Sequence, residues 1–144
     1  MDAGPTAQRL PSGVDPAAPV TRVVFVVLED SLLLDWAGPA EALRIANQVL
    51  RASDRPARFE TAFVGPETSA RASVGAWIDR LDPLPERLVA PTWLVLVGQP
   101  GQRIEVNRPA TQTLLRWLRP LRPTVGQLEL MCVCAGALLA AHAG

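Results

Sequence analysis

Apolar residues cluster in short continuous blocks that alternate with segments of helical periodicity. Blocks at residues 22–30, 92–98 and 127–134 are apolar without alternation, which is typical of strands buried on both faces. Residues 57–67 form a further strand pattern, with Phe59, Thr61 and Phe63 on one face and a stop at Gly65 and Pro66. Residues 68–89 carry a weak pattern, which predicts only a short strand near 76–78 and turns around Pro83 and Pro85.

Two helices are predicted between these strands. Residues 33–50 repeat Leu43, Ala46 and Leu50 at helical spacing, and residues 107–121 form an amphipathic segment that we expect Asn107 to cap. Its inward face is expected to hold Leu114, Leu121 and either Trp117 or Leu118. Strands recurring about every 35 residues, the length of a strand, a crossover helix and a return, predict an open, doubly wound and mostly parallel α/β sheet.

Composition narrows the class of protein. The 144 residues are 49% hydrophobic and 19% charged, which indicates a single globular domain after a Pro- and Gly-rich leader over residues 1–21. Fourteen basic residues balance fourteen acidic ones, so we expect neither nucleic acid nor a membrane as a partner of this chain. No secretory signal is recognisable, which favours the cytoplasm.

The polar candidates lie where the predicted strands end, which is where ligands bind in open α/β sheets. Cys134 follows the last strand and is surrounded by small residues, as a nucleophile in a tight strand-to-helix turn must be. The N-terminus of the next helix would favour its thiolate, whereas Cys132, inside the strand, is expected to be buried and inert. The alternative for Cys134 is also a small buried core residue.

Asp35 begins the first predicted helix, so it either caps that helix or faces Cys134 across the strand ends. Glu29 and Asp30 are rivals for the second role, and Gly98 with Gln99 offers backbone N–H groups at the neighbouring loop.

The remaining ligand chemistry is sparse. His142 is the only histidine and lies eight residues beyond Cys134 on one predicted helix, about 12 Å along its axis, too far to act as its base. Two cysteines and one histidine are too few for a zinc site, and the two cysteines are badly spaced for a disulfide with each other. Neither a metal nor another cofactor is therefore expected.

The segments LLLDWAGPAEALRIAN, WLVLVG and CVCAGALLAAHAG, in this order, resemble the ThiJ/PfpI domain of the class I glutamine amidotransferase-like superfamily over residues 22–144. The greatest likeness is to the sensor domain of AraC-type transcriptional regulators. The resemblance implies a flavodoxin-like sheet, with Cys134, Asp35 and Gly98 at the positions of the family's elbow cysteine, helix carboxylate and strand-end glycine. It further implies a site for a small-molecule ligand formed by Asp35, Gly98, Gln99, Cys134 and Ala135. Family members often dimerise, so a homodimer is left open.

The same resemblance leaves three functions open. Family members continue with further strands and, in regulators, a helix-turn-helix region, so the resemblance implies a domain that is incomplete at its C-terminus and lacks its DNA-binding part. The chain would then be the sensor of a regulator. The alternatives are a cysteine-dependent enzyme of the isocyanide hydratase or amidase type, with Cys134 and Asp35 as catalytic residues, and a fragment without a function of its own. Ala135, where relatives often have Thr, and Gln99, where they often have Gly, weaken the enzyme interpretation.

Overall fold

A parallel sheet forms the centre of the molecule. The computed structural model describes residues 18–101 and 104–144. Within them, five strands pair in the order β5-β2-β1-β6-β7, and every pairing is parallel. Their bounds are β1 Thr21–Val26, β2 Phe59–Gly65, β5 Asp82–Pro83, β6 Thr92–Leu96 and β7 Leu128–Cys132. The predicted doubly wound α/β architecture is therefore confirmed.

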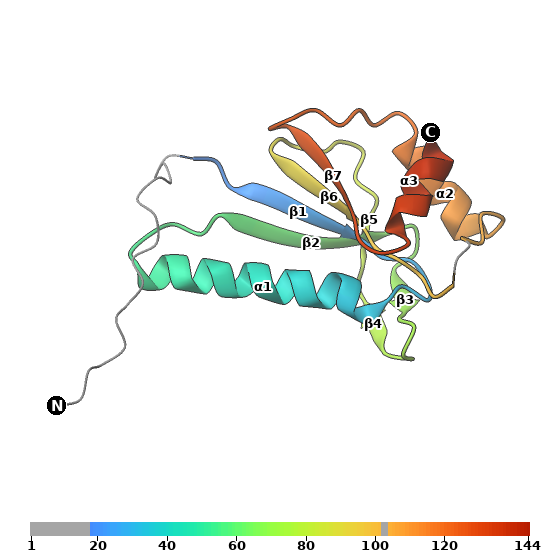
Figure 1. Ribbon diagram of the computed structural model, residues 1–144, viewed down its shortest axis with the longest axis horizontal. Coiled ribbons are helices and arrows are strands. Elements are labelled where there is room, and N and C mark those ends of the chain that lie inside the picture. Colours follow the sequence, from blue (N-terminus) through green and yellow to red (C-terminus); the bar gives the residue numbers. More distant parts are fainter. Residues whose placement is uncertain (1–17, 102–103) are drawn as a thin grey trace.

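Helices cover both faces of this sheet (Figure 1). Helix α1 (Leu33–Ala52) packs on one face, and α2 (Pro109–Leu118) and α3 (Gly136–Ala143) lie side by side on the other. Strand β1 is buried on both sides, as its unbroken apolar run predicted: Val23 and Phe25 belong to the cluster on the α1 face, and Val24 and Val26 to the cluster with α2 and α3. Because the strands are parallel, the loops that follow β1, β6 and β7 all lie at the carboxyl ends of the strands and come together there.

The weakly patterned segment forms more strands than expected. β3 (Ser69–Arg71) and β4 (Trp77–Asp79) make an antiparallel hairpin, and Pro83, predicted to lie in a turn, belongs to β5 beside β2. The amide of Asp30 donates to the carbonyl of Arg71 at 2.7 Å, which attaches the hairpin to the end of β1. Strands of two or three residues are too short to show an alternation in the sequence.

Two local predictions are wrong. Helix α2 begins at Pro109 and Arg108 occupies the N-cap position without a side-chain hydrogen bond, so Asn107 is not the cap. A proline at the first helical position needs no N–H partner and has a φ suited to the helix, which fixes the start there. Cys132 is exposed and not buried, because β7 forms one edge of the described sheet.

The leader predicted over residues 1–21 falls largely outside the described residues, which begin at 18; β1 starts at Thr21. Among the described residues, none of the helices combines the length and apolar character needed to cross a lipid bilayer.

Candidate functional site

Cys134 lies in a sharp turn between β7 and α3. Its φ is +53°, a left-handed backbone conformation that is uncommon for a residue other than glycine. The amide of Val133 donates to the Leu96 carbonyl at 2.9 Å, and the amide of Gly136 donates back to Val133 at 2.9 Å, so the turn is held against the end of β6. The side chain of Cys134 is exposed at the carboxyl edge of the sheet. This is the strand-to-helix elbow geometry that the small residues predicted.

Gly136 explains why this turn needs small residues. A Cβ on Gly136 would overlap the carbonyl oxygen of Leu96 and lie 2.7 Å from its carbonyl carbon. Only glycine therefore allows α3 to start directly against β6. The close approach fixes where the elbow stands relative to the neighbouring strand.

Asp35 contacts the adjacent loop and does not cap its own helix. The N-cap of α1 is Leu32, and Asp35 sits in the first turn with its Oδ2 accepting a hydrogen bond from the Gly98 amide at 3.1 Å. The capping alternative is therefore wrong. A carboxylate in a first turn also interacts favourably with the positive end of the helix dipole.

Gly98 is the point at which the predicted site residues meet. A Cβ on Gly98 would lie 2.9 Å from the Ala135 amide nitrogen, 3.0 Å from Oδ2 of Asp35 and 3.1 Å from Cβ of Cys134. Asp35 and Cys134, a hundred residues apart in the chain, thus flank one buried glycine. No hydrogen bond joins their side chains in the described part of the chain.

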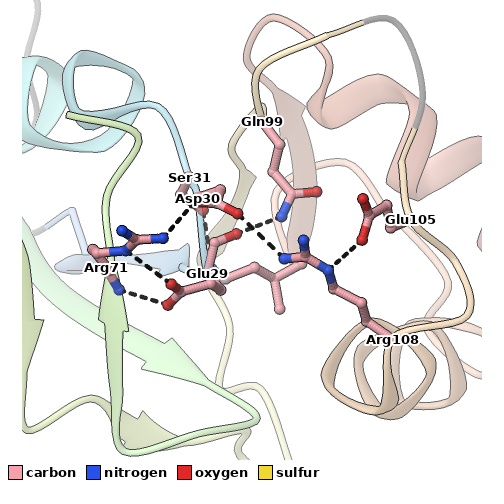
Figure 2. Close-up of polar contacts among 8 residues, drawn as sticks. Glu29, Asp30, Ser31, Arg71, Gln99, Glu105 and Arg108 are labelled. Atoms are coloured by element: carbon pink, nitrogen blue, oxygen red, sulfur yellow. Dashed lines mark hydrogen bonds and ion pairs between the residues drawn. The ribbon is translucent and has the colours of Figure 1, made fainter. Parts of the chain in front are cut away.

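Gln99 faces a neighbouring polar cluster. Its Nε2 donates to the Glu29 carbonyl at 2.6 Å (Figure 2). Two arginines from distant elements flank Glu29 and Asp30: Arg71 lies 3.2 Å from Oε1 of Glu29, and Arg108 lies 3.3 Å from Oδ2 of Asp30. Glu29 and Asp30, the predicted alternatives to Asp35, are therefore paired with arginines. In the described part of the chain, neither forms a hydrogen bond with Cys134.

An open pocket of about 310 Å³ lies beside this cluster and is lined by Asp30, Gln99, Pro100, Glu105 and Arg108. Arg108 also pairs with Glu105, and the hydrogen bonds that Arg108 donates to Glu105 and Asp30 raise its pKa. The guanidinium is thus a permanent charge at the mouth. The pocket has room and polar groups for a small molecule. Of the residues predicted to bind a ligand, Gln99 lines it, whereas Asp35, Gly98, Cys134 and Ala135 are not among its lining residues.

Sequence reasoning missed Arg71, Glu105 and Arg108. No feature of the sequence indicated Arg71 as a site residue, because its position depends on the β3–β4 hairpin, which was not predicted. Arg108, the first residue after the predicted cap Asn107, could have been found as a side chain at the start of the helix that follows β6.

The remaining candidates lie elsewhere. Burial raises the pKa of the Cys132 thiol, even though the residue as a whole is exposed at the sheet edge. His142 lines a groove between α2 and α3 with Arg116 and Arg119 and does not meet Cys134. Over the described ranges, no group of His, Cys, Asp or Glu is arranged to hold a metal ion.

Solved structures share this architecture. An AraC family transcriptional regulator from Pseudomonas putida is 19% identical with a TM-score of 0.55, and the match covers 84% of this chain and 69% of the regulator chain. A thiJ/pfpI family protein from Bacillus anthracis (16% identity, TM-score 0.49) and DJ-1 from Schizosaccharomyces pombe (14%, 0.47) match 86% and 85% of this chain, which spans 56% and 63% of theirs. No protein-family model and no curated protein matches the sequence. At these identities the likeness defines the fold alone, and the chain shares its open, parallel α/β fold with the regulator from Pseudomonas putida.

Proposed function

We propose that this chain is the small-molecule-sensing domain of a cytoplasmic AraC-type transcriptional regulator, whose DNA-binding part is not in this sequence. The observation that carries the proposal is the junction at Gly98, where Asp35 and Cys134 approach one glycine beside an open polar pocket. The fold shared with the regulator from Pseudomonas putida supports the same function. A homodimer is compatible with the proposal.

Binding is favoured over catalysis by the surroundings of Cys134. Cysteine nucleophiles usually need an adjacent base, most often histidine. The single histidine of the sequence, His142, lies in the α2–α3 groove, and the Asp35 carboxylate accepts a hydrogen bond from a backbone amide. The described residues therefore offer Cys134 a position for contact with a ligand but no histidine to activate it.

A small-molecule library screened by thermal shift tests the proposal. We expect ligands that raise the melting temperature of the wild-type chain but shift Gln99→Ala and Cys134→Ser markedly less. Arg51→Gln, a change at an exposed position in the last turn of α1, is the control and should respond like wild type. Ligands that stabilise all three variants equally would place binding elsewhere and contradict the proposed site.

The gene itself gives a second test. If the chain is a sensor, the reading frame beyond the codon for Gly144 should encode a helix-turn-helix region. The 144-residue chain alone should not retard operator DNA, because its formal net charge is zero. If this chain alone retarded DNA in a sequence-selective and salt-sensitive way, DNA binding would not belong to a separate part of the regulator, and the proposal would be contradicted.

A cysteine-dependent enzyme is the second candidate, favoured by the exposed thiol of Cys134 and its φ of +53°. Strained backbone often accompanies reactive groups. Mass-spectrometric detection of product from an isocyanide or an amide, abolished in Cys134→Ser, would establish it over the sensor. A fragment without a function would show neither turnover nor ligand-induced stabilisation.

A further inference from the structure

A groove between α2 and α3 lies apart from the Cys134 site. Its volume is about 470 Å³, and none of its lining residues belongs to the site at the sheet edge. Arg116 and Arg119 come from α2 and the segment just after it, and His142 comes from α3. Leu115 contributes an apolar part of the wall, and the side-chain amides of Asn107 and Gln112 add hydrogen-bonding groups.

None of the described residues that line this groove is acidic. Residues 106–144 contain four arginines and a single acidic residue, Glu129. Glu129 pairs in register with Trp93, which belongs to the cluster on the α1 face of the sheet. Since directly paired residues project on the same face, Glu129 points away from the groove. The carboxylate of Glu105, which precedes this segment, is held by Arg108 at the other pocket.

The two arginines keep N–H groups available. Arg116 donates to the carbonyl of Gln112 at 3.4 Å and to Oγ1 of Thr113 at 3.2 Å, both neutral acceptors on its own helix. In the described part of the chain, neither Arg116 nor Arg119 forms an ion pair with a carboxylate. A guanidinium has five N–H donors, so each arginine retains donors for an anion.

A purely structural role would explain only part of this arrangement. Arginines in the last turn of a helix complement the negative end of its dipole, and Arg116 is so placed. That role requires neither a hollow next to the arginines nor the histidine contributed by a second helix. The hollow and the convergence of cationic and amide groups on it point to a ligand.

We propose that the α2–α3 groove binds a small molecule that carries a phosphate group. Guanidinium groups match phosphate oxygens with paired hydrogen bonds, and Leu115 offers apolar surface to the organic part of such a ligand. The volume falls within the range of small-molecule pockets, about 300–1,000 Å³.

Isothermal titration calorimetry of the full chain tests the proposal, with adenosine 5′-monophosphate and inorganic pyrophosphate as probes and adenosine as the phosphate-free control. We expect both phosphate probes to bind and adenosine not to bind. The double variant Arg116→Gln with Arg119→Gln should weaken binding by about tenfold or more. If circular dichroism shows that the double variant is unfolded, Arg119→Gln alone replaces it and should weaken binding by a smaller factor. The matched control is Arg51→Gln, which removes the same charge from the last turn of α1.

Three results would overturn the proposal. The first is the absence of binding of either phosphate probe at concentrations up to about 10 mM. The second is an equal loss in Arg51→Gln, which would show a response to net charge alone. The third is retention of short duplex DNA with no binding of the two small probes, which would assign the arginines to a nucleic-acid backbone. The groove does not share residues with the Cys134 site, so a failure of phosphate binding here leaves the proposed ligand site at Gly98 untouched.

Discussion

Gly136→Ala and Gly38→Ala make the same chemical change in two helices of one chain, with different expected effects. Gly38 lies within α1, and a Cβ there would meet no atom of another element within 4 Å. Gly136 begins α3, and a Cβ there would overlap the Leu96 carbonyl oxygen and lie 3.2 Å from the carbonyl carbon of Val97. Both obstructing groups are backbone of β6 and the residue after it, so no side-chain rotation relieves the overlap.

The magnitudes follow from these surroundings. Alanine in place of glycine within an unobstructed helix stabilises by about 0.5–1 kcal/mol, because it reduces the backbone entropy of the unfolded chain. Overpacking a rigid site costs about 1–3 kcal/mol, and an obstruction by strand backbone belongs at the upper end of that range. We therefore expect Gly136→Ala to destabilise by about 2 kcal/mol or more. Pro39 follows Gly38 within α1 and disfavours a helical residue with a Cβ before it, which offsets the entropic gain, so Gly38→Ala should stay within about 0.5 kcal/mol of wild type.

Urea unfolding followed by tryptophan fluorescence measures both changes. The two variants should have the same dependence on urea as wild type and differ only in their midpoints, with that of Gly136→Ala well below wild type and that of Gly38→Ala close to it. A Gly136→Ala midpoint equal to or above wild type would refute the close approach of α3 to β6. If the urea midpoint of Gly38→Ala fell as far as that of Gly136→Ala, the obstruction by the β6 backbone would not be specific to Gly136.

Three further predictions concern the site. Iodoacetamide at pH 8 should label Cys134 faster than Cys132 in the folded chain, because burial raises the pKa of the Cys132 thiol and so lowers its thiolate fraction; mass mapping that finds Cys132 labelled first would contradict the elbow. Asp35→Ala should lower the free energy of unfolding by about 1–2 kcal/mol, since the buried Gly98 amide loses its charged acceptor; an unchanged urea midpoint would rule out that hydrogen bond. Arg71→Ala should cost less than about 1 kcal/mol, because its ion pairs are exposed to solvent; a loss that is larger and persists in 1 M salt would show that the pairs are stronger than their exposure implies.

Strong local patterns predicted most of the fold correctly. The apolar block that became β1 has no alternation, and the structure buries it on both faces. The helical repeat of Leu43, Ala46 and Leu50 lies within α1. Over residues 68–89 the short strand predicted near 76–78 is confirmed as β4, but β3 and β5 were missed. Strands of two or three residues are stabilised by partners distant in sequence and leave no periodic signal.

The candidate site was predicted only in part. The sequence identified Cys134, Asp35 and Gly98 as residues at strand ends, but it left Asp35 with two roles. The N-cap at Leu32 and the hydrogen bond from Gly98 exclude the capping role, and that bond exists because β6 lies next to β1 in the sheet. That pairing order is not encoded in either segment alone.

What the sequence determined by itself was the local character of each segment: a buried strand, an amphipathic helix, a turn that only small residues can make. The tertiary structure decided which of these segments became neighbours. Cys132 is exposed because β7 is an edge strand, and Arg71 meets Glu29 because a hairpin folds back onto the end of β1. Periodicity records how one segment divides its residues between two faces, whereas strand order and crossover geometry determine what each face meets.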